Sequence, residues 1–367
     1  MASPSILFSP IAVGGVTIPN RFARSATQDY MATDEGAATD RQVELYSRLA
    51  EGEVGLIITG HAYVRKEGQA SPRQLALSDD RFVAGLARIA AAVHRFPSRV
   101  FLQIAHAGRQ TKEKLCGSTP VSPSAVYDPV SKVMPRELDA AEIEALVRDF
   151  VQAARRAKES GFDGVQLHVA HGYLLSSFLS PHTNRRTDGW GGPLENRVRV
   201  VVEIVRGVRS VLGRGFPVIV KLNSTDFLER GLTVDESVRA AVILEQAGID
   251  GVEVSGGMAE AGRGSIWAGL RAPEDEGYFV AAAARIKASV DVPVLGLGGI
   301  RSLEVAEEFV QEGLVDLVSM SRPFIRDPEL VRNFREGRLA ISECISCNKC
   351  MNPRGIRCGD LAPKRPV

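Results

Sequence analysis

The chain has 367 residues, of which 44% are hydrophobic and 24% charged, values ordinary for a folded globular protein. Lys and Arg number 45 against 44 Asp and Glu, so no charge excess predicts binding to nucleic acid or to an anionic membrane. The first ten residues lack the basic and apolar regions of a secretory signal, and no apolar run is long enough to span a membrane. We therefore expect a cytoplasmic protein that acts on small molecules.

Short apolar runs alternate along the chain with segments of helical periodicity, such as residues 139–160 and 192–212. This alternation is typical of parallel strands joined by helices, and the nearly continuous apolar character of the runs indicates strands buried on both faces. We predict a single (β/α)8 TIM barrel, of the α/β class, over residues 1–342. A doubly wound open sheet is the weaker alternative, because candidate catalytic residues follow several different strands. The eight predicted strands are Phe22–Ala26, Val54–Thr59, Val100–Ala105, Val165–Val169, Val218–Leu222, Val252–Ser255, Val294–Gly298 and Leu317–Met320.

Two segments interrupt this pattern. Residues 106–137, after the third strand, are rich in Pro and Ser, which is typical of an active-site loop or lid. Residues 343–367 form a Cys-rich tail in which Pro and Gly prevent a continuous helix. We treat this irregular tail as separate from the barrel.

The fourth strand is followed by His168, His171 and Tyr173, at the end of the barrel where catalytic groups are expected. Two histidines three residues apart are also compatible with a polar pair or half of a metal site. As hydrogen-bond donors, the imidazoles could polarise a substrate carbonyl group, and the phenol could supply a proton.

The ends of the seventh and eighth strands predict a phosphate site. Gly298 and Gly299 allow close approach of the backbone, a helix beginning near Ser302 favours an anion, and Ser321 and Arg322 add donors. Barrels frequently bind phosphate at this position. The phosphate could belong to a cofactor or to a phosphorylated substrate.

Lys221 and Gln103 are polar residues within apolar strands. Lys221 needs an anionic partner, which could be a ligand or Glu253 on the neighbouring strand. It could also form a Schiff base in a barrel aldolase that uses no redox cofactor. Gln103 either contacts a ligand or belongs to a buried polar network.

Several motifs resemble the old yellow enzyme family of FMN-dependent NADH:flavin oxidoreductases and ene-reductases over nearly the whole chain. The stretch from His168 to Arg197 carries the most specific part of this resemblance. The motifs are Leu7-Phe8-Ser9-Pro10, Pro19-Asn20-Arg21, Gly55 to Gly60, Gln103 to Arg109, His171-Gly172-Tyr173-Leu174, Phe178-Leu179-Ser180-Pro181, Asn184 and Arg186-Thr187-Asp188.

The resemblance implies FMN as cofactor and NAD(P)H as hydride source, with an activated alkene as the second substrate. It implies that His168 and His171 bind the substrate carbonyl and the flavin edge, that Tyr173 donates the proton, and that Tyr30 lines the substrate pocket. Barrels of this group often self-associate, so a homo-oligomer is a further expectation. The implied FMN-binding residues are Ser25, Ala26, Thr27, Gly60, Gln103, Lys221, Gly298, Gly299, Ser321 and Arg322.

The tail carries Cys344, Cys347, Cys350 and Cys358. It is similar to the iron–sulfur segment that follows the barrel in 2,4-dienoyl-CoA reductases, although the spacing here is tighter. The cysteines could hold a [4Fe-4S] cluster, zinc or no metal. With a cluster, the alternative function is an FMN/iron–sulfur reductase subunit that receives electrons from a partner protein.

Overall fold

The computed structural model describes residues 5–262 and 264–361. Within them, eight parallel strands close into one barrel, because β4 pairs with both β3 and β6. The predicted TIM barrel is therefore confirmed. In chain order, the barrel strands are β3 (Phe22–Arg24), β4 (Leu56–Ile58), β6 (Arg99–Ala105), β9 (Gly164–Val169), β10 (Val218–Asn223), β11 (Gly251–Ser255), β12 (Val294–Gly296) and β13 (Leu317–Met320).

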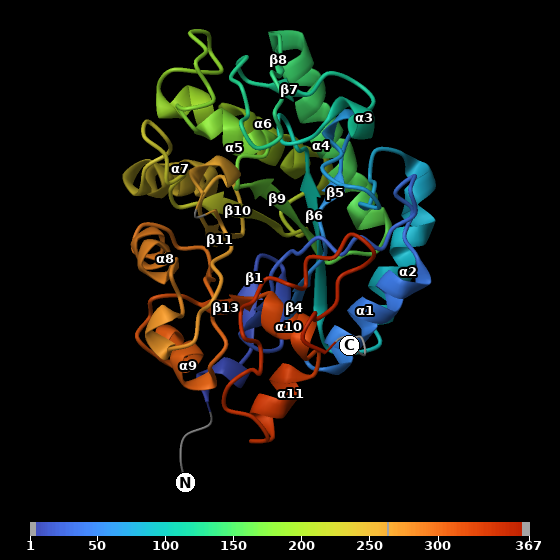
Figure 1. Ribbon diagram of the computed structural model, residues 1–367, viewed down its shortest axis with the longest axis vertical. Coiled ribbons are helices and arrows are strands. Elements are labelled where there is room, and N and C mark those ends of the chain that lie inside the picture. The colour runs from blue at the N-terminus through green and yellow to red at the C-terminus, as the bar shows by residue number, and fades with distance from the viewer. Residues whose placement is uncertain (1–4, 263, 362–367) are drawn as a thin grey trace, which may run out of the picture.

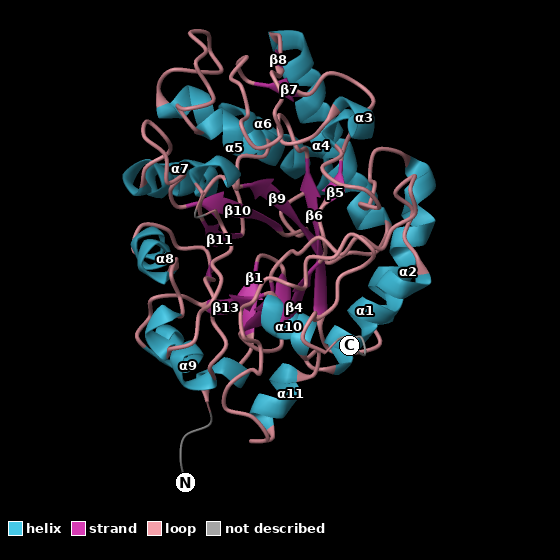
Figure 2. Cartoon of the chain, in the orientation of Figure 1, coloured by secondary structure: helices cyan, strands magenta, loops and turns pink. Residues whose placement is uncertain are grey.

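Helices connect successive strands and surround the sheet (Figures 1 and 2). Both helices anticipated from periodicity are present. One of them, α4, begins with a capping box, in which Asp139 accepts from the Glu142 N–H at 2.8 Å and the Glu142 carboxylate accepts from the Asp139 N–H at 2.9 Å. The surrounding helices are α1 (Asp40–Glu51), α2 (Val83–Val93), α4 (Ala140–Glu159), α6 (Leu194–Leu212), α7 (Val234–Ala247), α8 (Val280–Lys287), α9 (Leu303–Gln311), α10 (Arg322–Arg326) and α11 (Leu330–Arg335).

An N-terminal hairpin of β1 (Ile11–Val13) and β2 (Val16–Ile18) closes one end of the barrel. Its side chains Val13 and Ile18 join an apolar cluster with Leu56, Phe101 and Leu295 inside the barrel. Polar side chains line the opposite end of the barrel, where the strands finish. The remaining short elements are β5 (Ala62–Tyr63), α3 (Glu113–Cys116), β7 (Val121–Ser122), β8 (Arg136–Glu137) and α5 (Leu174–Leu179).

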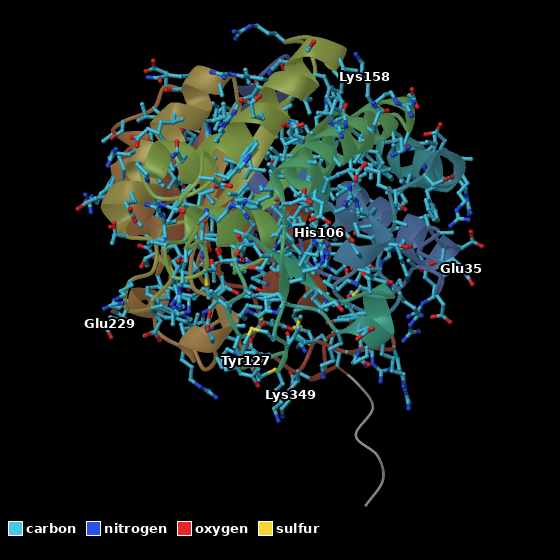
Figure 3. The ribbon with its side chains drawn as sticks, turned by 90° about the horizontal axis from the view of Figure 1, so that it is seen from above. Glu35, His106, Tyr127, Lys158, Glu229 and Lys349 are labelled. Atoms are coloured by element: carbon cyan, nitrogen blue, oxygen red, sulfur yellow. The ribbon has the colours of Figure 1, made fainter. Side chains whose placement is uncertain are left out.

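The loops that follow the strands share one face of the molecule with the tail. In Figure 3, Tyr127 after β6, Glu229 after β10 and Lys349 in the tail lie at one side, while Lys158 near the end of α4 lies at the opposite side. The tail therefore covers the face on which a barrel enzyme builds its active site. None of the helices in the described part of the chain is long and apolar enough to cross a bilayer.

Candidate active site

A cavity of about 350 Å³ lies at the carboxyl ends of the strands. The strand ends, the loop of residues 256–278 and the tail form its walls. Of the residues anticipated at the site from sequence, only Gly60 does not line it, because its N–H lies against Tyr46 and donates to the phenol oxygen at 2.8 Å. Those that line the cavity are Ser25, Ala26, Thr27, Tyr30, Gln103, His168, His171, Tyr173, Lys221, Gly298, Gly299, Ser321 and Arg322.

One end of the cavity, which we call the donor end, is formed by His168, His171 and Tyr173. The ring centroid of His168 lies 5.2 Å from that of His171 and 4.7 Å from that of Tyr173. The chain turns sharply here, since His171 has a left-handed backbone with φ of 64°. Two side chains hold this turn: Asn223 Oδ1 accepts from the His171 N–H at 3.0 Å, and Gln110 Nε2 donates to the His171 carbonyl at 2.7 Å.

Burial determines the protonation of the donor end. Burial and the nearby Lys221 lower the pKa of His171 to about 3. Burial, His171, His61 and Lys221 hold the pKa of His168 well below its usual value. Burial raises the pKa of Tyr173. At neutral pH both imidazoles are therefore uncharged and the phenol keeps its proton.

Lys221 lies in the centre of the cavity wall. The register of β9, β10 and β11 aligns His168, Lys221 and Glu253, and the Lys221 Nζ lies 2.7 Å from Ser25 Oγ and 3.3 Å from Glu253 Oε2. Burial alone would raise the pKa of Glu253, but Lys221 and hydrogen bonds including one from Ser319 Oγ, at 2.6 Å, keep it below its usual value. Lys221 therefore pairs with Glu253, and it also lines the cavity in which a ligand could meet it.

Gln103 also lines the cavity while its side-chain amide is hydrogen-bonded within the protein. Its Nε2 donates to Gln166 Oε1 at 2.7 Å, and Gln166 Nε2 donates to Glu253 Oε2 at 2.9 Å. A buried polar network thus connects Gln103 to Lys221 beneath the cavity floor. Such a network fixes the side chains that a ligand would meet.

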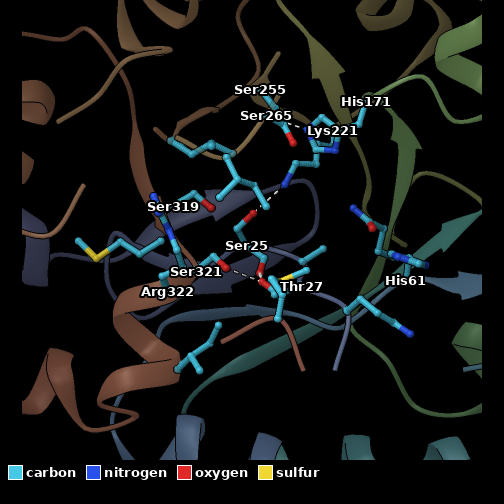
Figure 4. A pocket seen from close by; sticks show the side chains of 18 of the residues that line it. Ser25, Thr27, His61, His171, Lys221, Ser255, Ser265, Ser319, Ser321 and Arg322 are labelled. Atoms are coloured by element: carbon cyan, nitrogen blue, oxygen red, sulfur yellow. Dashed lines mark hydrogen bonds between the residues drawn. The ribbon is translucent and has the colours of Figure 1, made fainter. Parts of the chain in front are cut away.

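The other end of the cavity, which we call the phosphate end, is formed by Gly298, Gly299, Ser321 and Arg322. Both glycines have positive φ, and a Cβ on Gly298 would lie 2.7 Å from the backbone nitrogen of Tyr278, so only glycine fits there. Ser321 Oγ lies 2.7 Å from Thr27 Oγ1. Figure 4 shows Arg322 and Ser321 on one side of the pocket, with Ser25 and Lys221 between them and the histidines.

Arg322 is held by segments far away in the sequence. Its Nη1 donates to the Trp267 carbonyl and to Asn348 Oδ1, both at 2.7 Å, and lies 3.4 Å from the Ser346 carbonyl. Trp267 belongs to the loop after β11, and the other two belong to the tail. Carbonyl and amide oxygens, none of which carries a positive charge, therefore orient the guanidinium group.

A carboxylate holds the segment that precedes α9. Arg301 and Ser302 come before Leu303, the first residue of α9, and donate their N–H groups to Glu276 Oε2 at 2.8 and 2.9 Å. Ser302 Oγ also donates to Glu276 Oε1 at 2.6 Å. Glu276, from the loop after β11, therefore binds the N-cap residue of α9, while the N–H group of Leu303 donates to the Ala340 carbonyl at 2.8 Å.

The four tail cysteines border a second, smaller pocket together with Arg326. Cys350 also borders the main cavity, so the two spaces adjoin each other. A single zinc ion needs its sulfur ligands roughly 4 Å apart. Among the described residues, no three His, Cys, Asp or Glu side chains form a group able to hold a metal ion. This also removes the half-metal-site interpretation of His168 and His171 within that part of the chain.

Sequence reasoning missed part of the cavity wall. His61 lies three residues after the end of β4 and packs against both His168 and Tyr173. A histidine close to a strand's carboxyl end was the available signal. Tyr278, Asn348 and Met351 carried no such signal, because loops and the tail bring them to the cavity. The segment 106–137, anticipated as a lid, contributes only Gln110 to the described lining.

Comparisons with known proteins agree with this geometry. Residues 6–340 match the NADH:flavin oxidoreductase / NADH oxidase family. The chain belongs to this family. It is 39% identical to an NADH oxidase of Thermoanaerobacter brockii over 93% of this chain and 52% of that protein. It is also 36% identical to an NADPH dehydrogenase of a Geobacillus species over 88% of this chain and 92% of that protein.

Solved structures give the same picture. A 2-naphthoyl-CoA reductase superposes with a TM-score of 0.88 at 32% identity, covering 94% of this chain and 54% of that one. The old yellow enzyme homologue of Zymomonas mobilis superposes with a TM-score of 0.82 at 28% identity, covering 97% and 98%. The resemblance to old yellow enzymes is thus confirmed. The chain nevertheless spans only about half the length of the NADH oxidase and the 2-naphthoyl-CoA reductase that it matches.

The residues present fit FMN, the cofactor typical of this family. His168 Nδ1 is buried and has no hydrogen-bond partner among the described residues, as expected of an atom that a ligand completes. Gly298 and Gly299 leave space beside Arg322 for a phosphate group. The cavity joins these two features without interruption.

Proposed function

We propose that the chain is an FMN-dependent ene-reductase that transfers hydride from NAD(P)H to activated carbon–carbon double bonds. One observation carries the proposal: a single cavity connects a phosphate end to a donor end made of two neutral imidazoles and a protonated phenol. When bound, FMN supplies hydride transfer between the nicotinamide and the alkene. The backbone at Ser25 to Thr27, with Gln103 and Lys221, would hold its ring, and Gly298, Gly299, Ser321 and Arg322 would hold its phosphate.

His168 and His171 polarise the substrate carbonyl in this proposal. A neutral imidazole donates a hydrogen bond but carries no positive charge that would bind an anion strongly. Its N–H group therefore stabilises the negative charge that develops on an enone oxygen during hydride transfer. His171 Nε2 lies 2.7 Å from Ser255 Oγ, which fixes its ring plane. The unpaired Nδ1 of His168 supports the view that a ligand atom completes this side of the cavity.

Tyr173 supplies the proton. Its raised pKa keeps the phenol protonated, and its contact with His168 puts it beside the group that binds the carbonyl. Tyr30 lines the same cavity and has a left-handed backbone with φ of 56°, so its side chain is directed by a constrained turn. We assign Tyr30 to the substrate pocket.

The tail cysteines favour a second candidate, an FMN/iron–sulfur reductase subunit fed by a partner protein. A [4Fe-4S] cluster takes four thiolate ligands, and the four tail cysteines border one pocket. Cys350 borders both spaces, so electrons would have a short path to the FMN cavity. An aldolase function is disfavoured, because an ion-paired Lys221 is not the free amine that a Schiff base requires.

The visible spectrum of the anaerobically purified protein, before and after NADH or NADPH is added, tests both candidates. A flavin spectrum that bleaches promptly, without iron in the sample, would establish direct turnover by NAD(P)H. Broad iron–sulfur absorbance with slow bleaching would favour the partner-fed subunit. Cys344→Ser is the matched control, since it should remove iron but leave the flavin. A colourless protein that binds no added FMN would contradict both.

A further inference from the structure

His61 is a third imidazole in the cavity, and it lies next to His168. Its ring stacks with that of His168 at a centroid distance of 6.1 Å and an angle of 23°. Its edge packs against Tyr173 at 5.5 Å and 80°. Tyr173 therefore contacts both His168 and His61 and lies beside this stacked pair.

The hydrogen bonds of Gln74 determine the tautomer of His61. The Gln74 Oε1 accepts from the Ala70 N–H at 2.7 Å and lies 3.4 Å from the Ser71 nitrogen, so the oxygen of this side-chain amide is assigned by backbone donors. The amide nitrogen therefore faces His61 Nδ1, at 2.7 Å. Because an amide nitrogen only donates, Nδ1 is the acceptor and the ring proton resides on Nε2.

The charge of His61 follows from its surroundings. Burial and Lys221 lower its pKa to about 4, so the ring is neutral at physiological pH. Nε2 has no acceptor among the described residues, yet it is not among the buried atoms that lack a partner, so it is open to the cavity. The cavity thus contains a permanent N–H donor that the roles of His168 and His171 do not use.

We propose that His61 Nε2–H binds a second acceptor oxygen of the substrate, so that the site prefers alkenes activated at both ends, such as enediones and quinone-like rings. This inference rests on the proposed ene-reductase function. His168 and His171 take one carbonyl oxygen, and His61 takes the other. Tyr173, in contact with both His168 and His61, then lies beside the double bond that separates the two carbonyl groups.

A matched pair of substrates tests the preference. Isophorone has one carbonyl group, and ketoisophorone has the same carbon skeleton with two. In the FMN-loaded enzyme, His61→Phe keeps an aromatic ring without a donor, and we expect it to lower kcat/KM for ketoisophorone about 5- to 10-fold more than for isophorone, the value of one hydrogen bond. His61→Gln, which returns an amide donor, should recover much of the difference.

Control measurements separate His61 from other effects. His94→Gln alters a histidine that pairs with Asp163 away from the cavity, and it should leave the ratio of the two substrates unchanged. Equal losses on both substrates in His61→Phe would overturn the proposal, because they would assign His61 to the cofactor or to the fold. Nitrogen NMR of histidine-labelled protein should show His61 as the Nε2–H tautomer, and an Nδ1–H tautomer would also overturn it.

A ligand-binding measurement tests the role of His61 without depending on catalytic turnover. Hydroquinone carries two oxygens across a ring and phenol carries one, and both can be titrated into the oxidised holoenzyme by following the flavin spectrum. His61→Phe should weaken hydroquinone binding about 5- to 10-fold more than phenol binding. If the wild-type holoenzyme reduces neither alkene, the proposed function fails, while this binding ratio still decides the role of His61.

Discussion

The two ends of the cavity are built in opposite ways. The donor end comes from one strand and the turn after it, so that His168, His171 and Tyr173 lie within six consecutive residues. The phosphate end gathers residues that follow two different strands, β12 and β13, and its Arg322 is held by Trp267 and Asn348. Local chain geometry thus positions the side chains of the donor end, and long-range packing positions those of the phosphate end. Changes at each end should have separate consequences.

Tyr173→Phe is the largest expected effect and should affect the donor end alone. Losing the proton donor should slow alkene reduction by about 10²- to 10⁴-fold, the usual contribution of general acid catalysis. Reduction of the flavin by NAD(P)H should stay within a few-fold of wild type, because that half-reaction needs no proton from Tyr173. Stopped-flow measurement of the two half-reactions checks this. Equal losses in both would remove Tyr173 from its assigned role.

Arg322→Met should affect the phosphate end alone. A hydrogen-bonded charge on a phosphate stabilises binding by about 1.5–3 kcal/mol, so FMN affinity should fall roughly 10- to 150-fold. FMN fluorescence on release from the protein measures the dissociation constant. At saturating FMN, the rate of alkene reduction should recover most of the way. A rate that stays low at saturation would mean that the two ends are not separable.

The pH dependence of stability should report the donor end. The pKa of His171, about 3, and that of His61, about 4, both lie below the unfolded value near 6.5, so the unfolded state binds protons first as the pH falls. The contribution of these two histidines should be fully present above pH 7 and be lost as the pH falls from about 6.5 towards 4 for His61 and 3 for His171, by at most about 1.4 kcal/mol per pH unit for each histidine. Both rings face a solvent-accessible cavity, which reduces this figure.

Urea unfolding of the protein at several pH values measures that slope. His171→Asn removes one of the titrating rings and should make the dependence shallower. His94→Gln, which changes a more exposed histidine with an Asp163 partner, provides the comparison. A slope unchanged in His171→Asn would mean that this imidazole titrates normally in the folded protein.

The substitution Asn348→Ala has the smallest expected effect, and it tests whether the tail supports the phosphate end. It removes one acceptor from Arg322 and leaves the Trp267 carbonyl in place. Loss of one hydrogen bond of about 1 kcal/mol predicts FMN binding weaker by roughly 5-fold. The same fluorescence assay as for Arg322→Met applies. FMN affinity equal to wild type would show that the tail does not support the phosphate end.

The tail also illustrates why a sequence-based division into barrel and tail is incomplete. Ile356 donates its N–H to the Asp29 carbonyl at 2.8 Å, next to Tyr30, and the backbone N–H of Gly269 donates to the Ser346 carbonyl at 3.0 Å. The tail therefore contacts loops on both sides of the cavity. Its cysteine spacing was visible in sequence, but its place over the strand ends was not.

The sequence by itself determined the barrel and the donor end. Strand and helix periodicity are local properties, and His168 near the end of a predicted strand, with His171 and Tyr173 just after it, places these side chains at the strand's carboxyl end. Only the tertiary structure decided which groups meet: Lys221 with Glu253, the segment before α9 with Glu276, and Arg322 with the tail. It also decided the tautomer of His61, since that depends on Gln74, which a separate loop brings to the ring. The physical reason is that hydrogen-bond partners are chosen by distance in space, whereas periodicity is set by neighbours along the chain.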